Sequence, residues 1–403
     1  MPQLKSLTKA YSGISKEMWI LAIAMLINRC GSMVLLFMSV YLTQKMNFSI
    51  SKAGLVLSMF GLGSLLGAFV GGKLVDRYGF YPILWSSLIL SGIMLLILGQ
   101  MEHYILIAIF TFMVTATGDM FRPANMASIN SYSHKEGYTQ AIALNRLAMN
   151  LGFTIGPILG GFLAFYSYHF LFWADGITCI TAASFLLLKL PKREQVRVDK
   201  KSIPKHITLS PYKDANYLYF LFFTMLYALA FFQLLTTLPL FYKNEYQLSE
   251  KYIGWLMALN GIGVAVMEMF LLYYIRNKWT QFKFIALGCL LLIVAYLILM
   301  PVHSIPILII NILLLTFSEM VAMPFMSTYM MHRSEGKNMG DYSALYSMSW
   351  STALILAPVF GTQIIDHFGY AYLWVGLAAI GTIAFVGFRW LELRSVEERK
   401  RSV

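Results

Sequence analysis

Charged side chains interrupt several apolar stretches of this 403-residue sequence. An ionisable group is costly inside an apolar membrane helix, so each one is a candidate functional residue. Asp119 lies in the N-terminal half, and Glu268 and Glu319 lie in the C-terminal half. A desolvated carboxylate can take up a proton near neutral pH, whereas a guanidinium keeps its proton. These acids are therefore candidate proton carriers, and the alternative for each is a structural interhelical hydrogen bond.

The arginines of the apolar stretches all lie in the N-terminal half, at Arg29, Arg122 and Arg146. Asp119 and Arg122 are three residues apart, so they share a helix face and can pair, as a structural or gating contact. Counting along the helices places Arg146 at a similar depth and Arg29 near the middle of the membrane. This excess of positive charge favours an anionic or zwitterionic ligand group. Alternatively, a C-terminal glutamate pairs with Arg29 in one conformation.

Other polar residues in apolar stretches could line a substrate cavity. The candidates are Asn28, Asn145, Asn150, Tyr227, Gln233 and Asn260. The sequence also holds 24 tyrosines and 25 methionines, whose adaptable side chains suit varied ligands. The alternative for each candidate is packing between helices or facing lipid.

The elements that would position these groups are transmembrane helices. Hydrophobic residues make up 58% of the chain and charged residues 12%, about half the charge of a soluble domain. The apolar residues recur in blocks about 20 residues long, the length that crosses a bilayer as a helix. None of them alternates as a membrane strand would. The expected helices span 18–43, 50–72, 82–100, 104–128, 140–165, 168–190, 216–241, 252–275, 281–301, 305–330, 341–365 and 370–391.

The basic residues indicate how the helices are oriented. When the loops are assigned alternately to the two sides, 24 of the 31 lysines and arginines fall on one side and four on the other. Such asymmetry marks the cytoplasmic side, so both termini and the basic segment 191–213 are predicted to be cytoplasmic. The net charge of +12 then reflects topology, and we expect no nucleic-acid partner. The first apolar block is too long for a cleavable signal peptide.

The two halves of the chain resemble each other. At an offset of 201, Pro123, Pro157, Gly160 and Trp173 match Pro324, Pro358, Gly361 and Trp374, and at 200, Gly54, Gly61 and Gly63 match Gly254, Gly261 and Gly263. Such parallel repeats place a substrate path between the halves, near the middle of the membrane. We expect a six-helix bundle at 1–190, a linker at 191–213 and a second bundle at 214–403.

Two motifs make the chain resemble the major facilitator superfamily. Gly72-Lys-Leu-Val-Asp76-Arg77-Tyr-Gly79 is similar to the family's G-x-L-x-D-R-x-G signature. Its glycines allow a tight turn, Asp76 can cap a neighbouring helix and Arg77 can pair across the turn. The family's usual basic residues are replaced here by Phe-Tyr-Pro. The alternative is a loop with no role in gating.

The second motif lies in the expected helix 140–165. Gly152-Phe-Thr-Ile-Gly156-Pro157-Ile-Leu-Gly160-Gly161 resembles the G-x-x-x-G-P-x-x-G-G stretch of the family's antiporters. Glycines at this spacing let helices approach closely, and Pro157 can bend the helix. Close packing without an antiport role is the alternative. In the family's peptide symporters an E-x-x-E-R-F pattern occurs near Arg29, but both glutamates are absent here.

The resemblance implies an all-α protein with twelve transmembrane helices in two parallel-repeat bundles. It also implies a transporter of the inner (cytoplasmic) membrane that works by alternating access. We expect proton-coupled export of amphiphilic small molecules, with proton-coupled symport of a peptide, sugar or anionic metabolite as the alternative. No nucleotide-binding loop, catalytic constellation or metal-ligand spacing occurs, and the three cysteines lie singly in apolar blocks. We therefore expect a monomer without enzymatic activity, metal or cofactor, whose partners are the substrate, protons and the bilayer.

Overall fold

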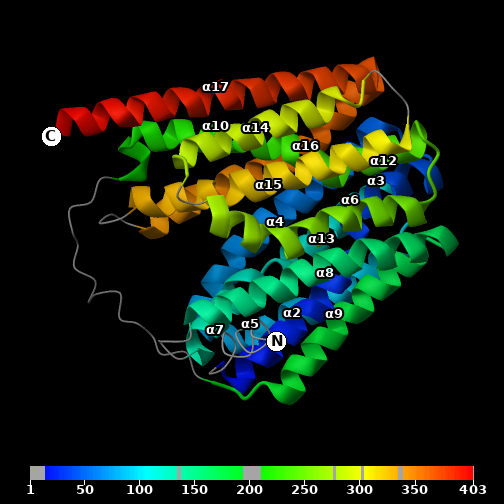
Figure 1. The fold of residues 1–403 in the computed structure, drawn as a ribbon. Helices are drawn as coiled ribbons and strands as arrows, with labels where there is room; N and C mark the ends of the chain where they lie inside the picture. Colours follow the sequence, from blue (N-terminus) through cyan, green and yellow to red (C-terminus); the bar gives the residue numbers. More distant parts are fainter. Residues whose placement is uncertain are drawn as a thin grey trace, which may run out of the picture. The chain divides into compact units, whose positions relative to one another are not determined.

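The computed structural model describes residues 14–133, 138–193, 210–275, 278–300, 304–334 and 339–402. Every element in these ranges is helical (Figure 1). The N-terminal half contains α2 (Lys16–Cys30), α3 (Val34–Val40), the π-helical turn η1 (Tyr41–Lys45), α4 (Ile50–Tyr78), α5 (Phe80–Leu98), α6 (Tyr104–Gly118), α7 (Phe121–Tyr132), α8 (Tyr138–Tyr166) and α9 (His169–Lys189). The C-terminal half contains the short 3-10 turn η4 (Pro211–Lys213), α10 (Ala215–Phe231), α11 (Gln233–Thr236), α12 (Leu238–Asn244), α13 (Glu250–Ile275), α14 (Gln281–Leu297), α15 (Ile305–Ser334), α16 (Met339–Phe368) and α17 (Tyr370–Ser402).

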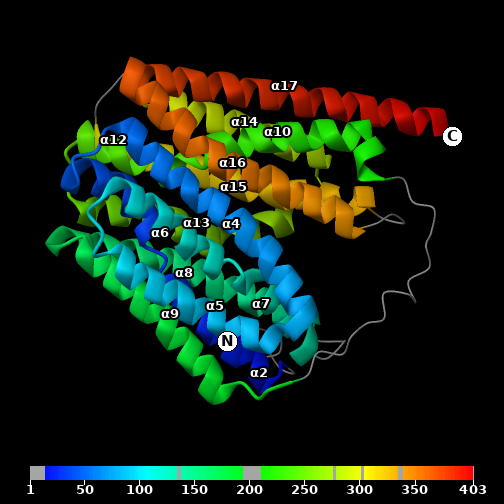
Figure 2. The same ribbon diagram turned by 180° about the vertical axis from the view of Figure 1, so that it is seen from behind.

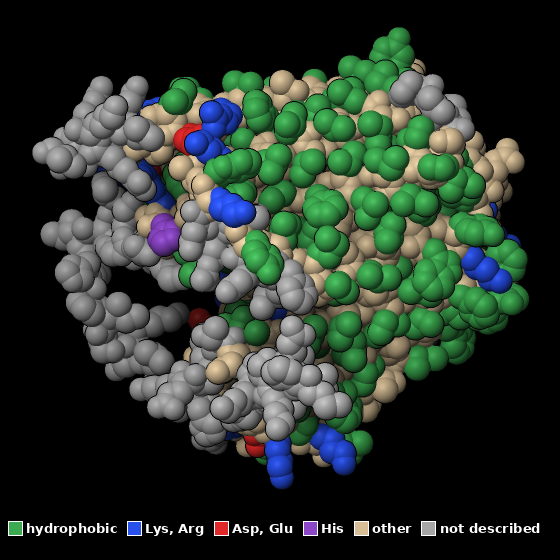
Figure 3. Space-filling model, in the orientation of Figure 1, with side chains coloured by type: hydrophobic (Ala, Val, Ile, Leu, Met, Phe, Trp, Pro, Cys, Tyr) green, Lys and Arg blue, Asp and Glu red, His purple; other side chains and the backbone are tan. Residues whose placement is uncertain are grey.

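Each of the twelve predicted apolar ranges coincides with helical segments, some of them interrupted or ended by turns, and residue 301 of the range 281–301 lies outside the described residues. Ten helical segments of the described residues are long and apolar enough to cross a membrane, and the apolar α14 is slightly shorter. Hydrophobic side chains cover the middle of the second unit's helices in the upper part of Figure 3, with lysine and arginine towards the helix ends. This pattern fits a lipid-facing surface between two aqueous sides. The protein is thus a multi-pass membrane protein. Residues 194–209 of the predicted linker lie outside the described residues, and the side of the termini stays a prediction.

The described chain divides into two compact units. The first contains Met1–Met38, Met59–Val198 and Ser249–Gly261, and the second contains Ser39–Ser58, Asp199–Leu248 and Ile262–Val403. Each unit therefore takes the beginning of one long helix, α4 or α13, from the other half of the sequence. The domain boundaries at 190 and 214 stay a prediction.

The first unit packs its helices around an apolar core. In it α2 contacts α8 and α9, and α5 contacts α6 and α9 (Figure 2). Leu21, Ala24, Phe80, Phe121 and Leu186 are among the buried residues that join these helices. This packed apolar core fixes the positions of the helices α2, α6 and α7 that carry the polar candidates.

The second unit repeats the same pattern of contacts. Here α10 contacts α16 and α17, and α14 contacts α15 and α17, each pair being the counterpart of one in the first unit. Individual contacts repeat as well: a Cβ on Gly160 would lie 2.9 Å from Met33 Cβ, and a Cβ on Gly361 would overlap Gln233. Gly361 lies 201 residues after Gly160, and Gln233 lies 200 residues after Met33, so the two contacts are equivalent in the repeat. The predicted repeat is thus confirmed at the level of side-chain packing.

The N-terminal parts of α4 and α13, each of which belongs to the unit formed mainly by the other half of the sequence, make equivalent contacts too. In the second unit, Gly54 on α4 faces the carbonyl oxygen of Pro358 on α16, 3.0 Å from a Cβ placed on the glycine. In the first unit, Gly254 on α13 lies against the carbonyl oxygen of Pro157 on α8. Only glycine lets one helix approach a backbone carbonyl of another this closely. The repeated glycines and prolines are contact points in both units.

An ion-paired network joins three helices at one end of the second unit. Asp214, which caps the start of α10, binds Arg333 on α15 through two bonds of 2.9 and 2.8 Å. The Tyr342 hydroxyl on α16 donates to the same carboxylate at 3.0 Å, and the Tyr217 N–H donates at 3.2 Å. Burial alone raises the pKa of Asp214, but the bonds and charge of Arg333, with Tyr342 and Tyr217, lower it to about 2.

This network should make stability depend on pH. Because the folded pKa of Asp214 lies below its ordinary value of 3.8, the stabilisation is present above pH 4 and is lost as pH falls towards 2. Asp214→Asn should therefore lower the free energy of unfolding by about 2 kcal/mol at pH 7. Thermal unfolding in detergent should show a gap between the variant and the parent that is constant above pH 5 and narrows below pH 4. The exposed loop residue Glu102 gives the control, Glu102→Gln; an equal loss there would contradict the network.

Candidate functional site

The first transmembrane segment is broken where its polar residues lie. Helix α2 ends at Cys30, and α3 begins at Val34 after a turn. The buried Asp175 on α9 accepts a hydrogen bond from the Val34 N–H at 3.3 Å, which satisfies a free donor at the start of α3. Gly31 is required at this turn, because a Cβ would overlap Thr178 and lie 3.2 Å from Asp175 Oδ1. Asp175 thus has a structural role at the start of α3.

The fourth predicted segment is broken at its charged residues as well. Helix α6 ends at Gly118, and Asp119 and Met120 form a turn before α7. Asp119 Oδ1 lies 3.0 Å from Arg122 Nε, so the predicted pair is present. The carboxylate stands at the N-terminal end of α7, where the helix dipole favours a negative charge. A helix break that carries ionisable groups is typical of binding sites in transporters.

Arg29 lies at the centre of the charged groups in the first unit. It occupies the last turn of α2, where a cation is favoured by the helix dipole. Arg122, Asp119, Cys179 and Asp175 are the ionisable groups close enough to act on it electrostatically. Its guanidinium stands 5.5 Å from the centre of the Phe153 ring. In the described part of the chain, the buried Arg29 Nε has no hydrogen-bond partner.

The glycine motif of α8 packs closely against Arg29 and the end of α2. A Cβ on Gly152 would overlap Arg29 Cβ, and one on Gly156 would lie 3.3 Å from the carbonyl oxygens of both Arg29 and Cys30. Further along α8, a Cβ placed on Gly161 would lie 3.0 Å from the Cα of Gly254 on α13. The predicted close packing of this motif is therefore confirmed. This packing brings the backbone of α8 into close contact with Arg29.

The other polar candidates of the first unit have varied surroundings. Asn145 accepts a hydrogen bond from Asn125 at 3.3 Å, which links α8 to α7. Asn28 donates to the Cys179 sulfur at 3.3 Å and is buried. Arg146 is exposed on α8, whereas Asn150 and Asn260 are half-buried. The similar depth of Arg146 and Asp119 stays a prediction, and the ionisable groups that act on Arg29 lie on α7, on α9 and in the turn between α6 and α7.

Two candidates of the second unit are fully buried among hydrogen-bonding groups. The Tyr227 hydroxyl pairs with Ser318 at 2.9 Å. Gln233 donates to the Ala357 carbonyl at 2.8 Å and accepts from the Thr237 hydroxyl at 2.8 Å. Gln233 stands at the break between α10 and α11, so it joins that break to α16. In this structure both side chains serve helix packing.

The two C-terminal glutamates lie on helices that approach each other. A Cβ on Gly263 of α13 would lie 2.7 Å from Thr316 Cγ2 of α15. Glu319 is one turn beyond Thr316 on the same face of α15, and Glu268 is five residues beyond Gly263. Glu268 is 8% exposed and Glu319 is half-buried. Within the described residues, no group of three His, Cys, Asp or Glu could hold a metal ion.

The signature motif between α4 and α5 forms the predicted tight turn. Gly79 alone separates the two helices, and its φ of 84° is one that glycine adopts readily. Asp76 and Arg77 are exposed in the last turn of α4, with Arg77 5.2 Å from the Tyr78 ring. No atom lies within 4 Å of a Cβ placed on Gly72. The gating role of this motif stays a prediction.

Sequence reasoning missed the aromatic partner of Arg29 and the two helix breaks. Phe153 follows Gly152 in the sequence and lies beside Arg29 only because α2 and α8 pack closely. The spacing of the glycines was the one sign of that packing in the sequence. The breaks leave little trace, because the apolar runs continue through them. Gly31-Ser32 and Gly118-Asp119 were the available signals.

Solved structures share this fold. A nucleoside transporter, NupG, matches with a TM-score of 0.77 and 13% identity, covering 94% of this chain and 99% of that chain. A peptide transporter, POT, in complex with sulfate, matches with a TM-score of 0.79 and 13% identity, covering 95% and 94%. At these identities the likeness concerns the fold.

Curated bacterial proteins are similar over most of their lengths. The uncharacterized MFS-type transporter YttB of Bacillus subtilis (strain 168) is 24% identical, over 90% of this chain and 91% of its own. Multidrug resistance protein 2 of the same organism is 21% identical (83% and 85%), and a Na(+), Li(+), K(+)/H(+) antiporter of Planococcus maritimus is 22% identical (89% and 91%). The Major Facilitator Superfamily model matches residues 21–351 and 220–403. The chain therefore belongs to the Major Facilitator Superfamily, and it is a transporter rather than an enzyme.

Proposed function

We propose that this transporter exports amphiphilic small molecules in exchange for protons, by alternating access of its two repeats. The observation that carries the proposal is the charge centre around Arg29, held against the antiporter-like glycine motif of α8. Two similar proteins are named as a multidrug resistance protein and a cation/proton antiporter, which supports export by exchange.

The surroundings of Arg29 favour one class of amphiphile. A guanidinium binds carboxylates and other oxyanions through paired hydrogen bonds, and the adjacent Phe153 ring offers an apolar face. Asp119 and Arg122 stand at the nearby break and would complement a zwitterion. The substrate we propose therefore has an aromatic or aliphatic body and an anionic or zwitterionic end.

The second candidate function is proton-coupled uptake of a polar anionic or zwitterionic solute. It is favoured by the buried Arg29 Nε, which has no partner within the described residues, as a site awaiting a polar ligand would. It is also consistent with the solved structures of similar fold, which are titled as peptide and nucleoside transporters. The two candidates differ in the direction of proton movement.

Proteoliposomes can distinguish proton exchange from proton symport by the direction in which the pH inside the vesicles changes. Vesicles holding a pH-sensitive dye are loaded with one compound from a panel of organic anions, zwitterions and cations, and the membrane potential is clamped. As the compound leaves, exchange moves protons inward and acidifies the lumen, whereas symport moves them outward and makes it alkaline. Acidification with an amphiphilic compound, absent from protein-free vesicles, is the expected result. Alkalinisation would establish symport, and no signal with any compound would contradict both.

Arg29→Gln should weaken the binding of an anionic or zwitterionic substrate. Losing one charge-assisted hydrogen bond at a buried site reduces affinity by about tenfold or more. Arg146→Gln is the comparison, because Arg146 is exposed on α8, so we expect a smaller effect. Equilibrium binding to the purified variants measures both. Equal affinities for Arg29→Gln and the parent protein would show that this arginine does not contact the substrate.

A further inference from the structure

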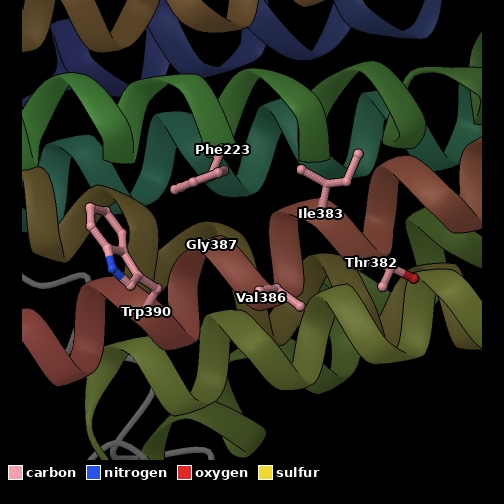
Figure 4. A pocket seen from close by; sticks show the side chains of 6 residues that line it. All are labelled: Phe223, Thr382, Ile383, Val386, Gly387 and Trp390. Carbon is pink, nitrogen blue, oxygen red and sulfur yellow. The ribbon is translucent and has the colours of Figure 1, made fainter.

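A groove runs along the outer face of the second unit. It is formed between α10 and α17, has a volume of about 420 Å³ and is lined by Phe223, Thr382, Ile383, Val386, Gly387 and Trp390. Figure 4 shows Trp390 at one end and Thr382 at the other, with Phe223 across from Val386 and Gly387. Apart from the Thr382 hydroxyl and the indole N–H, its lining side chains are apolar. At membrane depth such a groove is filled by a hydrocarbon chain.

The floor of the groove depends on a glycine. A Cβ on Gly387 would lie 2.5 Å from Cδ1 of the Phe223 ring, so any larger residue would push the ring aside. Ile383, Val386 and Trp390 are 52%, 58% and 40% exposed, so they stand open to the surroundings. The groove is thus an open slot whose depth is set by one missing side chain.

One end of the groove is aromatic and basic. The Trp390 ring packs edge-on against Tyr219 of α10, with ring centres 5.2 Å apart. The Arg394 guanidinium stands 5.2 Å from the centre of the Trp390 ring. Tryptophan, tyrosine and arginine in this order mark the boundary between hydrocarbon and headgroups. The groove therefore runs from the membrane interior towards a fixed positive charge.

The dimensions fit one leaflet of a bilayer. From Thr382 to Arg394 the stripe covers thirteen residues of α17, whose ends are about 18 Å apart at the helical rise. One leaflet contributes about 15 Å of hydrocarbon. The positive-inside pattern predicts that the Arg394 end faces the cytoplasmic leaflet, where acidic lipids are concentrated.

We propose that this groove binds an acidic phospholipid of the cytoplasmic leaflet. One acyl chain lies along Ile383, Val386 and Gly387, and the phosphate of the headgroup lies at the Arg394 guanidinium. The headgroup charge distinguishes this ligand from any other lipid that could fill the apolar slot. Tyr219 and Trp390 place the glycerol region between the two parts.

A second groove of the same unit repeats this arrangement. It has a volume of about 340 Å³ and an apolar lining that includes Leu287 and Phe317. Trp279 and Lys278 line it too, and the Trp279 ring lies 5.4 Å from that of Phe284. An apolar slot with a tryptophan and a cation therefore occurs twice on this surface, which argues against chance juxtaposition at α17.

Native mass spectrometry of the full-length protein in detergent tests the proposal. The protein is titrated with phosphatidylglycerol and, separately, with phosphatidylcholine of the same acyl chains. Phosphatidylglycerol should bind more tightly, and Arg394→Gln should weaken it by about fivefold while leaving phosphatidylcholine unchanged. Lys189→Gln is the matched control, because Lys189 is an exposed basic residue at the end of α9, the counterpart of α17. It should bind both lipids as the parent protein does.

Gly387→Leu tests the apolar part of the site. By displacing Phe223 into the slot it should weaken both lipids equally, and the thermal midpoint in lipid-free detergent shows whether the variant is folded. Equal binding of the two headgroups by the parent protein would show annular lipid only and would overturn the proposal. Unchanged phosphatidylglycerol affinity in Arg394→Gln would overturn it as well, whatever the result for Gly387→Leu.

Discussion

Transport should fall to background when Gly152 is replaced by leucine. A Cβ at this position would already overlap Arg29 Cβ, and leucine adds three more carbons between α8 and α2. The helices would have to separate, which moves Arg29 away from Phe153 and from Asp119. Overpacking one contact costs about 1–3 kcal/mol, too little to unfold a multi-helix membrane protein. The measurement is substrate-driven proton movement in proteoliposomes, normalised to the amount of inserted protein.

A glycine at which a Cβ would make only ordinary van der Waals contacts supplies the control. The atoms closest to a Cβ on Gly376 of α17 are the side-chain ends of Ile364 and Phe360, at 3.9 and 4.0 Å. Gly376→Leu should therefore transport at close to the parental rate. If Gly152→Leu retained near-normal transport, the α2–α8 contact would not be needed at any step of the cycle.

The double variant Glu268→Gln/Glu319→Gln should lose transport driven by a pH gradient while it still binds substrate. Glutamine imitates a permanently protonated glutamate, so the variant cannot release the coupled proton. The two acids are proposed as the carriers because α13 and α15 meet at Gly263 and Thr316, close to both along their helices. In the N-terminal half, Asp119 is already bound to Arg122 through a contact of 3.0 Å.

The test compares two readouts over a range of pH. Accumulation of substrate against its gradient is measured with an imposed pH difference, and binding is measured at equilibrium, for each single variant and the double. Lost accumulation with preserved binding supports proton transfer by these residues. Wild-type pH dependence in the double variant would rule them out and leave Asp119 as the carrier, while lost expression would indicate a structural role.

The order and approximate limits of the membrane-spanning segments could be predicted from the sequence because each apolar block had to cross the same thickness of lipid. The repeat predicted more than topology: Gly160 and Gly361, matched by position, occupy equivalent contacts in the two units. These features depend on periodicity and spacing, which a sequence displays directly. The close packing of Gly152 and Gly156 was predictable for the same reason.

The rotation of each helix about its axis could not be predicted. Tyr227 and Gln233 are polar residues in apolar helices, and that pattern alone does not show whether they face a cavity or a neighbouring helix. Both turn towards hydrogen-bonding partners contributed by distant segments, Ser318 and Ala357. Arg146 was likewise a candidate for the substrate cavity, and the structure shows only that it is exposed on α8. Direction around a helix is set by tertiary packing, which single-sequence reasoning does not contain.

The exchange of helix beginnings between the two units sets an order for biosynthesis. Gly161 rests against Glu250 and Gly254, so the first unit lacks part of its packing until the ribosome has delivered residue 261. Similarly, Gly54 emerges early but packs against Pro358 and Thr362, which are made some 300 residues later. A nascent chain halted after the first six helices would therefore expose two glycine surfaces inside the bilayer. Until translation ends, membrane chaperones would have to shield those surfaces from proteolysis and from wrong helix partners.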